Sequence, residues 1–219
     1  MKSLNEIPFG GGKPIPVLDA GLYPARLAEV IELGIQKGRV YMGEQKPPSL
    51  EYMLTFECLD EFLENDKGEP DETKPRFFSL RFVPKNISSI RATSTIVYKA
   101  LDPEYAFGGD FTKLVNTPCV IELVRNKGEA GKPDKNYISS VLPMRAKEKL
   151  KAKPLVNPAI IFDFYNFDPD VFKSLKPWQQ TVIKEALDWN GREVLAPVDG
   201  EPQVDKPKDE EEEAILLLH

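Results

Sequence analysis

The segment KPRFFSLRFVPK, residues 74–85, combines four cations with three phenylalanines and a leucine and contains no acid. If it forms a strand, its side chains alternate between two faces of a sheet. One face then holds Arg76, Phe78, Leu80 and Phe82, and the other holds Phe77, Ser79, Arg81 and Val83. The first set suits a hydrophobic core. The second places a ring, a hydroxyl and a guanidinium about 7 Å apart in succession, which suits a polymer with flat rings and a charged backbone.

An alternative interpretation of the second set stays open. Phe77 can lie under a helix, and the stem of Arg81 can follow an apolar surface while its charged head reaches water. The alternation thus predicts a strand. It does not decide whether the second set of side chains faces a ligand or the interior of the protein.

Two further strands are predicted before this segment. Residues 21–36, GLYPARLAEVIELGIQ, are rich in Val, Ile and Leu and indicate a long, bent first strand. Residues 49–62, SLEYMLTFECLDEF, alternate between two sets and indicate a second strand. The charged residues 63–75 then form a turn, so that the second and third strands make a hairpin.

The pattern after Pro84 changes to helical spacing. Residues 86–102 predict a helix capped by Asn86 or Ser88 and stopped at Asp102, and residues 103–116 have room for a short second helix. Residues 117–127 and 136–144 return to strand character. The order is strand, strand, strand, helix, strand, strand, which is the order of an OB-fold, a five-stranded Greek-key barrel. The predicted fold class is therefore mainly β with helices.

The chain divides into four predicted parts. Residues 1–20 form an N-terminal extension, and residues 21–153 form the OB-fold domain. Residues 154–194 contain two short helical patterns, with Pro177 in the first turn of the second, and predict a helical hairpin docked on the barrel. Residues 195–219 have the composition of a disordered acidic tail.

The net charge of the chain, -6, comes largely from this tail. Residues 201–219 contain seven acids and two lysines, a contribution of -5, whereas residues 73–99 contain six cations and no acid. A second basic region, residues 124–153, has nine cations against three acids. An acidic total therefore conceals two basic segments of the kind that nucleic-acid-binding proteins use.

Several classes of protein are disfavoured by the sequence. No run of about 18 apolar residues is present and the first residues lack a secretory signal, so we expect a cytoplasmic protein without a membrane partner.

Cys58 and Cys119 fall within strand patterns and are expected to be free, buried thiols. The single histidine is His219. A catalytic triad, a metal site and a cofactor site are therefore not expected, and neither is an enzyme.

With these elements placed, the chain resembles a family of tailed-bacteriophage single-stranded DNA-binding proteins. The resemblance rests on YPARLAEVIELGIQ, KPPSLEYMLTFECLDEF, KPRFFSLRF, YKALDPE followed by GGDFTKLVNTPC, and LVNPAIIFDF followed by DVFKSLKPWQQTVIK. It implies an OB-fold that coats single strands during phage DNA replication, recombination or repair. It also implies an acidic tail that recruits replication or recombination proteins. The last residues, EEEEAILLLH, have an aliphatic tip where tails of this kind in bacterial proteins include an aromatic residue.

Binding of single strands without sequence preference requires cations along a groove and rings for base stacking. The expected DNA-binding residues lie in the loop after the first strand, on and after the third strand, and around the loop between the last two strands: Arg39, Tyr41, Lys46, Arg76, Phe77, Arg81, Lys85, Arg91, Arg125, Lys127, Lys132, Lys135 and Tyr137. The expected partner-binding residues are the tail acids Asp209, Glu210, Glu211, Glu212 and Glu213. A further hypothesis has this acidic run folding back over the basic groove until DNA displaces it.

Two other functions remain open at this point. One is a phage protein-interaction adaptor that does not bind nucleic acid. The other is a strand-annealing protein, which would share the binding residues of a passive coat.

Overall fold

The computed structural model describes residues 15–128 and 134–190. Its elements are β1 (Gly21–Gln36), β2 (Val40–Tyr41), β3 (Glu44–Gln45), β4 (Ser49–Glu64), β5 (Pro70–Phe82), α1 (Thr93–Leu101), the 3₁₀ helix η2 (Phe111–Leu114), β6 (Pro118–Asn126), β7 (Lys135–Pro143), α2 (Ala146–Lys149), β8 (Ile160–Phe162), α3 (Pro169–Ser174) and α4 (Pro177–Lys184).

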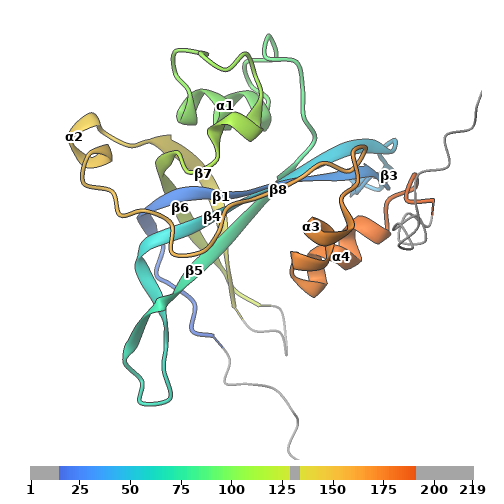
Figure 1. Cartoon of the computed structure of the whole chain (residues 1–219). Coiled ribbons are helices and arrows are strands. Elements are labelled where there is room, and N and C mark those ends of the chain that lie inside the picture. The colour runs from blue at the N-terminus through green and yellow to red at the C-terminus, as the bar shows by residue number, and fades with distance from the viewer. Residues whose placement is uncertain (1–14, 129–133, 191–219) are drawn as a thin grey trace, which may run out of the picture.

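The protein is mainly β, as the sequence predicts, and is built on a six-stranded sheet. The strands follow the order β5-β4-β1-β6-β7, all antiparallel, while β8 pairs with β1 in parallel. The predicted hairpin is β4 and β5, with Leu54 opposite Leu80 and Phe56 opposite Phe78. Figure 1 shows α1 on one side of the sheet and α3 with α4 on the other.

Side chains of the long strand β1 alternate between both sides of the sheet, and a register shift between Leu27 and Glu29 changes which positions face each side. Before the shift, Ala25 and Leu27 enter a first core. After it, Val30 also belongs to the first core, and Ile31 and Leu33 enter a second core. The first core joins the sheet to α1 and η2 and includes Leu54, Phe56, Phe82, Val97, Tyr98, Phe111, Cys119 and Ile121. The second core joins the sheet to the C-terminal segment, residues 154–190, and includes Met53, Phe162, Phe164, Phe172, Leu175 and Ile183.

A second register shift in β1 follows Glu32 and contains Gly34, whose φ is +73°. A Cβ at this position would lie 2.5 Å from Cζ of Phe164. A glycine is therefore required for the positive φ and for the close approach of the ring. Gly34 lets the C-terminal segment pack directly on the strand.

The helix after β5 begins later than predicted. Neither Asn86 nor Ser88 caps it, since the side chain of Asn86 accepts hydrogen bonds from the backbone and hydroxyl of Ser88 at 3.0 and 2.8 Å in a separate turn. This local turn competes with helix formation. The helix α1 begins at Thr93 and ends at Leu101, and the short helix expected in residues 103–116 is η2.

The C-terminal segment differs from a plain helical hairpin. The helices α3 and α4 begin where the two helical patterns predicted them, although α4 ends at Lys184 and does not continue to Asn190. The segment also contributes β8, which the sequence pattern did not predict. A strand of three residues is too short for its alternation to be recognised. Residues 191–194 and the predicted tail lie outside the described residues.

Part of the predicted N-terminal extension belongs to the fold. The side chain of Asn136 on β7 accepts from the backbone N–H of Leu18 at 2.7 Å and donates to its carbonyl at 2.9 Å. Leu18 also packs against the first core. Both cysteines are free and buried, as predicted.

Candidate nucleic-acid interface

The side of the β1, β4 and β5 sheet that faces the C-terminal segment is here called the second face. It consists of Glu29, Ile31, Leu33, Glu51, Met53, Thr55, Glu57, Phe77, Ser79 and Arg81. The sequence pattern assigned Phe77 and Arg81 on this face to DNA. In the structure Phe77 is half-buried, and Nζ of Lys176, from the start of α4, lies 4.2 Å from the centre of its ring. Beside this ring a pocket of about 460 Å³ remains.

Arg81 is engaged within the protein. Its guanidinium pairs with the carboxylate of Glu51 and donates to Oε1 of Gln36 at 3.2 Å. Both partners are buried, at 3 % exposure each. The charge of Arg81 therefore compensates a buried acid, whereas the alternative from the sequence had its charged head reaching water.

The second face also contains acids that are bound by the C-terminal segment. Glu29, 4 % exposed, accepts from Nζ of Lys176 at 2.9 Å and from Nε2 of Gln179 at 2.6 Å. Glu57, fully buried, accepts from the backbone N–H groups of Val156 and Asn157 at 2.7 and 3.2 Å. Buried carboxylates require such partners. These acids thus join the second face to the C-terminal segment.

The loop after β1 forms an arm, residues 37–48, that contains the β2 and β3 hairpin. Arg39 is exposed on it, with Nη2 3.6 Å from Glu51, and Nζ of Lys46 lies 3.6 Å from the carboxylate of Glu44. Tyr41 belongs to β2, and its side chain lies outside the described part of the structure.

The open end of the β6 and β7 hairpin holds a second group of predicted residues. Arg125 donates from Nε to Asp134 at 2.8 Å, with Nη2 also 2.8 Å from the same carboxylate. A hydrogen bond from the backbone of Gly128, together with Arg125, lowers the pKa of Asp134. Lys127 and Lys135 are exposed, as is the ring of Tyr137 at 52 %. Lys132 lies outside the described residues.

The remaining candidates lie along and after β5. The guanidinium of Arg76 lies 5.6 Å from the centre of the Phe78 ring. Lys85 and Arg91 lie in the segment between β5 and α1, where both are exposed. The tail acids Asp209 to Glu213 lie outside the described residues.

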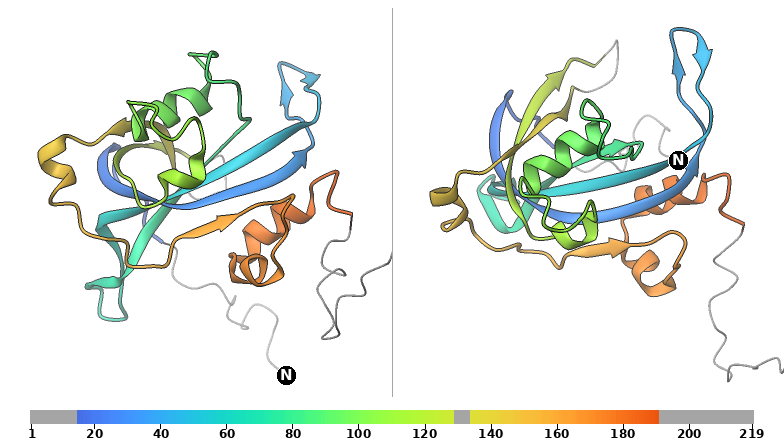
Figure 2. Two further views of the ribbon diagram at one scale, coloured as in Figure 1. Left: turned by 45° about the horizontal axis from the view of Figure 1, so that its top comes forward. Right: turned by 90° about the horizontal axis from the view of Figure 1, so that it is seen from above.

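The structure places two of the three predicted groups on separate projecting ends of the sheet, the arm and the open end of the β6 and β7 hairpin. In the right-hand view of Figure 2, the arm and the open end of the β6 and β7 hairpin project to the same side of the sheet. Phe77 and Arg81 do not join them, since they face the C-terminal segment. The sequence did not reveal Glu29, Glu51 and Glu57 as buried acceptors, because an acid at an alternate strand position usually faces water.

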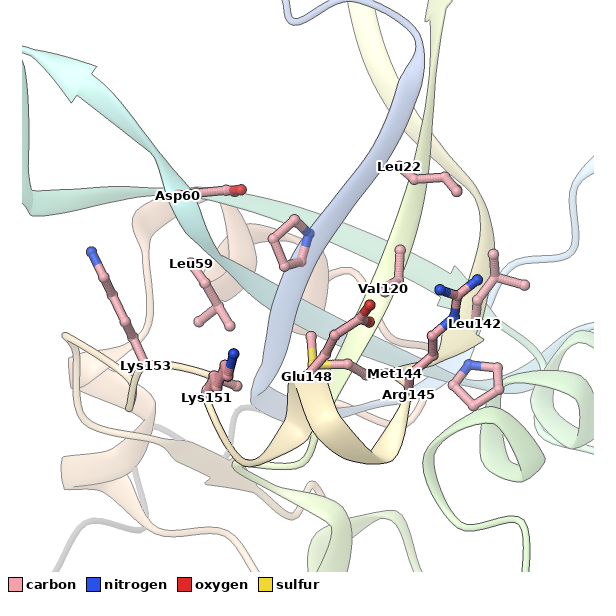
Figure 3. Close-up of a pocket in the computed structure, with 13 residues that line it drawn as sticks. Leu22, Leu59, Asp60, Val120, Leu142, Met144, Arg145, Glu148, Lys151 and Lys153 are labelled. Atoms are coloured by element: carbon pink, nitrogen blue, oxygen red, sulfur yellow. The ribbon is translucent and has the colours of Figure 1, made fainter.

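A separate apolar pocket of about 730 Å³ lies at the opposite end of the β6 and β7 ladder from Lys135 (Figure 3). Its lining side chains come from four strands and from the segment around α2. They include the apolar Leu22, Leu59, Val120, Leu142 and Met144. The charged residues at this pocket are Asp60, Arg145, Glu148, Lys151 and Lys153.

The described residues contain no group of three or more His, Cys, Asp or Glu side chains positioned to hold a metal ion. None of the helices in residues 15–128 and 134–190 has the length and apolar character needed to cross a membrane. Comparison with protein-family models and with curated proteins finds no match to this chain.

Proposed function

We propose that the protein binds single-stranded DNA without strong sequence preference through an OB-fold, and coats single strands during phage DNA replication, recombination or repair. In an OB-fold the first strand pairs with the second and the fourth, and the fifth pairs with the fourth. The order β5-β4-β1-β6-β7, with α1 between β5 and β6, supports this assignment. The sequence resemblance to phage single-stranded DNA-binding proteins supports the same class.

The observation that carries the proposal is that the arm and the open end of the β6 and β7 hairpin both project on the same side of the sheet in the right-hand view of Figure 2. Arg39, Lys127 and Lys135 are exposed there, and Tyr137 offers a ring for stacking. Exposed cations attract the phosphate backbone, and each base stacked on an aromatic ring contributes about 1–3 kcal/mol. The proposed contact surface therefore excludes the second face and uses the two projecting ends.

A titration of labelled oligo-dT, followed by fluorescence anisotropy at about 50 mM and about 200 mM salt, tests the proposal. We expect length-dependent binding that weakens at the higher salt. The variant Lys127→Ala/Lys135→Ala should weaken binding and reduce the salt slope by about 1 for each phosphate that the variant no longer neutralises. The matched control Lys147→Ala/Lys149→Ala removes two cations beyond the other end of β7 and should leave the slope unchanged. Absence of binding at the lower salt would overturn the proposal.

A second candidate function is a protein-interaction adaptor. The specific observation in its favour is the apolar pocket of about 730 Å³, with Leu22 and Leu142 exposed at 60 and 37 %. Pockets with this character are sites for protein or ligand contacts. The same titration separates the two functions, since an adaptor would bind no oligonucleotide at either salt concentration.

A further inference from the structure

The floor of the apolar pocket consists of aliphatic side chains from neighbouring strands. Leu22 and Pro24 are alternate residues of β1, and Pro24 lies opposite Val120 on β6, which in turn lies opposite Leu142 on β7. Side chains at such positions share one face of a sheet. Leu22 and Leu142 are exposed at 60 and 37 %. The pocket volume of about 730 Å³ falls in the range of about 300 to 1,000 Å³ that is typical of ligand sites.

The rim of this pocket is formed by the basic segment RAKEKLKAK, residues 145–153, which contains α2. The segment has five cations against one acid, a net charge of +4. Figure 3 shows Arg145, Lys151 and Lys153 at the pocket, together with the acids Asp60 and Glu148. Asp60 interacts with Lys153. Within residues 15–128 and 134–190, neither Arg145 nor Lys151 forms an ion pair with an acid. The rim therefore has positive charge that the described residues do not neutralise.

The basic segment is attached to the sheet at both ends. Arg26 on β1 donates from Nη2 to the carbonyl of Ala152 at 2.9 Å and from Nε to the carbonyl of Lys153 at 2.6 Å. At the other end, the side chain of Met144 is buried at 5 % exposure and lines the pocket. These contacts keep the cations beside the aliphatic floor.

One segment of this chain has the sequence that matches such a site. Residues 209–218, DEEEEAILLL, are five consecutive acids followed by an alanine and four aliphatic residues. No second run of five acids occurs in the sequence. The segment lies outside the described residues, but its two halves correspond in chemistry and in order to a cationic rim beside an aliphatic floor. The acidic half suits the rim, and the aliphatic half suits the floor.

The chain is long enough to bring this segment to the pocket. The backbone N–H of Leu187, near the end of the described residues, donates to the carbonyl of Ile35 at 2.8 Å. Leu22 lies 13 residues earlier on the same strand, about 43 Å away at about 3.3 Å per residue. The 24 residues from Asn190 to Ala214 can span up to about 80 Å. The segment can therefore reach the pocket of its own chain.

We propose that Ala214 to Leu218 occupy the apolar pocket of their own chain, with Asp209 to Glu213 beside the cations of residues 145–153. The aliphatic residues supply the affinity, and the acids direct them to this rim. The pocket lies at the opposite end of the β6 and β7 ladder from Lys135. The location therefore differs from the basic groove that the sequence suggested for the acidic run, and the inference does not depend on DNA binding.

Docking of this kind would regulate access to the acidic run. While the segment is docked, its acids and its aliphatic residues are covered by the pocket. A partner protein that binds the same segment must therefore compete with the pocket, and its apparent affinity falls by the fraction of chains in which the segment is docked.

The test measures disulfide formation between introduced cysteines in the full-length protein without DNA, with oxidised glutathione as the oxidant. Leu142→Cys/Leu217→Cys places one thiol at the pocket and one in the aliphatic half of the segment. Leu22→Cys/Leu217→Cys repeats the pairing from a more exposed pocket position, in case the first variant does not fold. Leu187→Cys/Leu217→Cys is the matched control, because Leu187 is 60 % exposed and closer along the chain.

The two native cysteines should not take part in this reaction. Burial raises the pKa of Cys58 and of Cys119 to about 12. The thiolate is the reactive form, and little of it is present near pH 8 at such a pKa.

Mass spectrometry of the monomeric product should show that each pocket pair joins about tenfold faster than the control pair, since docking raises the effective concentration of the segment at the pocket. Adding Arg145→Ala/Lys151→Ala should slow the pocket pairs about threefold, the effect of lost exposed ion pairs, and leave the control pair unchanged. Equal rates for the pocket and control pairs would overturn the inference, and so would pocket pairs that are insensitive to the loss of Arg145 and Lys151. Disulfides that join two chains in place of one would assign the pocket to the segment of a second copy and overturn docking within one chain.

Discussion

The two faces of the β4 and β5 hairpin are stabilised in different ways. The first face presents Leu54, Phe56 and Phe82 to α1 and η2, and its contacts are almost entirely apolar. The second face presents Glu51, Glu57 and Arg81 toward the C-terminal segment, and its contacts include charged hydrogen bonds. Apolar packing supplies stability without direction, whereas a buried acid must find particular donors. The first face therefore stabilises the sheet, and the second determines which segment covers it and in what position.

The largest effect in this comparison is expected from the first face. Phe56 is fully buried, and Phe56→Ala should reduce the free energy of unfolding by about 3 to 5 kcal/mol, because burial is forfeited and a cavity remains. Urea denaturation followed by circular dichroism measures the change. The matched control Leu142→Ala removes a partly exposed side chain and should have a much smaller effect. Equal reductions for the two variants would contradict the assignment of the first core.

The same comparison explains how much could be predicted from the sequence. The five long strands and the two C-terminal helices follow from patterns that apolar burial produces, such as the alternation in residues 49–62. The cover of the second face could not be predicted this way. Glu57 alternates like a solvent-facing residue, and two of its three donors are the backbone N–H groups of Val156 and Asn157, which leave no mark in the sequence, while the third is the side-chain amide of Asn157. Phe77 and Arg81 likewise have the spacing expected of side chains that face DNA. In the structure, Phe77 contacts Lys176 and Arg81 pairs with Glu51.

On the second face, removal of one acid should release the segment that it holds. Glu57→Ala leaves the backbone N–H groups of Val156 and Asn157 and the side-chain amide of Asn157 without this acceptor. The two backbone groups alone cost about 2 to 4 kcal/mol when they are unsatisfied. Limited proteolysis should cleave near residue 156 sooner than in the wild type, and urea denaturation gives the magnitude. Glu64→Ala, an exposed acid at the end of the same strand, is the control. Unchanged cleavage near residue 156 would show that the hydrogen bonds to Glu57 do not retain the segment.

Phe77 and Phe78 are neighbours on β5, both half-buried, and point to opposite faces. Phe77→Ala removes the ring beneath Lys176 and should cost about 1 to 2 kcal/mol, the sum of partial burial and a cation–π contact. Hydrogen exchange should increase in α3 and α4 and stay unchanged in α1. For Phe78→Ala, which packs against the first core, the increase should fall on α1 instead. Weaker oligo-dT binding by Phe77→Ala, without faster exchange in α3 and α4, would restore the second face as a DNA surface.

The smallest effect concerns Glu32, whose carboxylate accepts from the backbone N–H of Phe164 at 3.2 Å. Burial and the nearby charge of Asp163 raise the pKa of Glu32 above its ordinary value, so the folded protein disfavours the ionised form. The stability that protonation contributes is therefore present below the unfolded pKa of about 4.3 and is lost as the pH rises through the higher folded value.

Glu32→Gln keeps an acceptor for Phe164 but does not ionise. Its free energy of unfolding should match that of the wild type near pH 4 and exceed it increasingly toward pH 7. Urea denaturation at several pH values measures the difference, with Glu64→Gln as the exposed control. A difference that shrinks as the pH rises would mean that the donors around Glu32 outweigh its burial, and that this acid resembles Glu57 in preferring its charge.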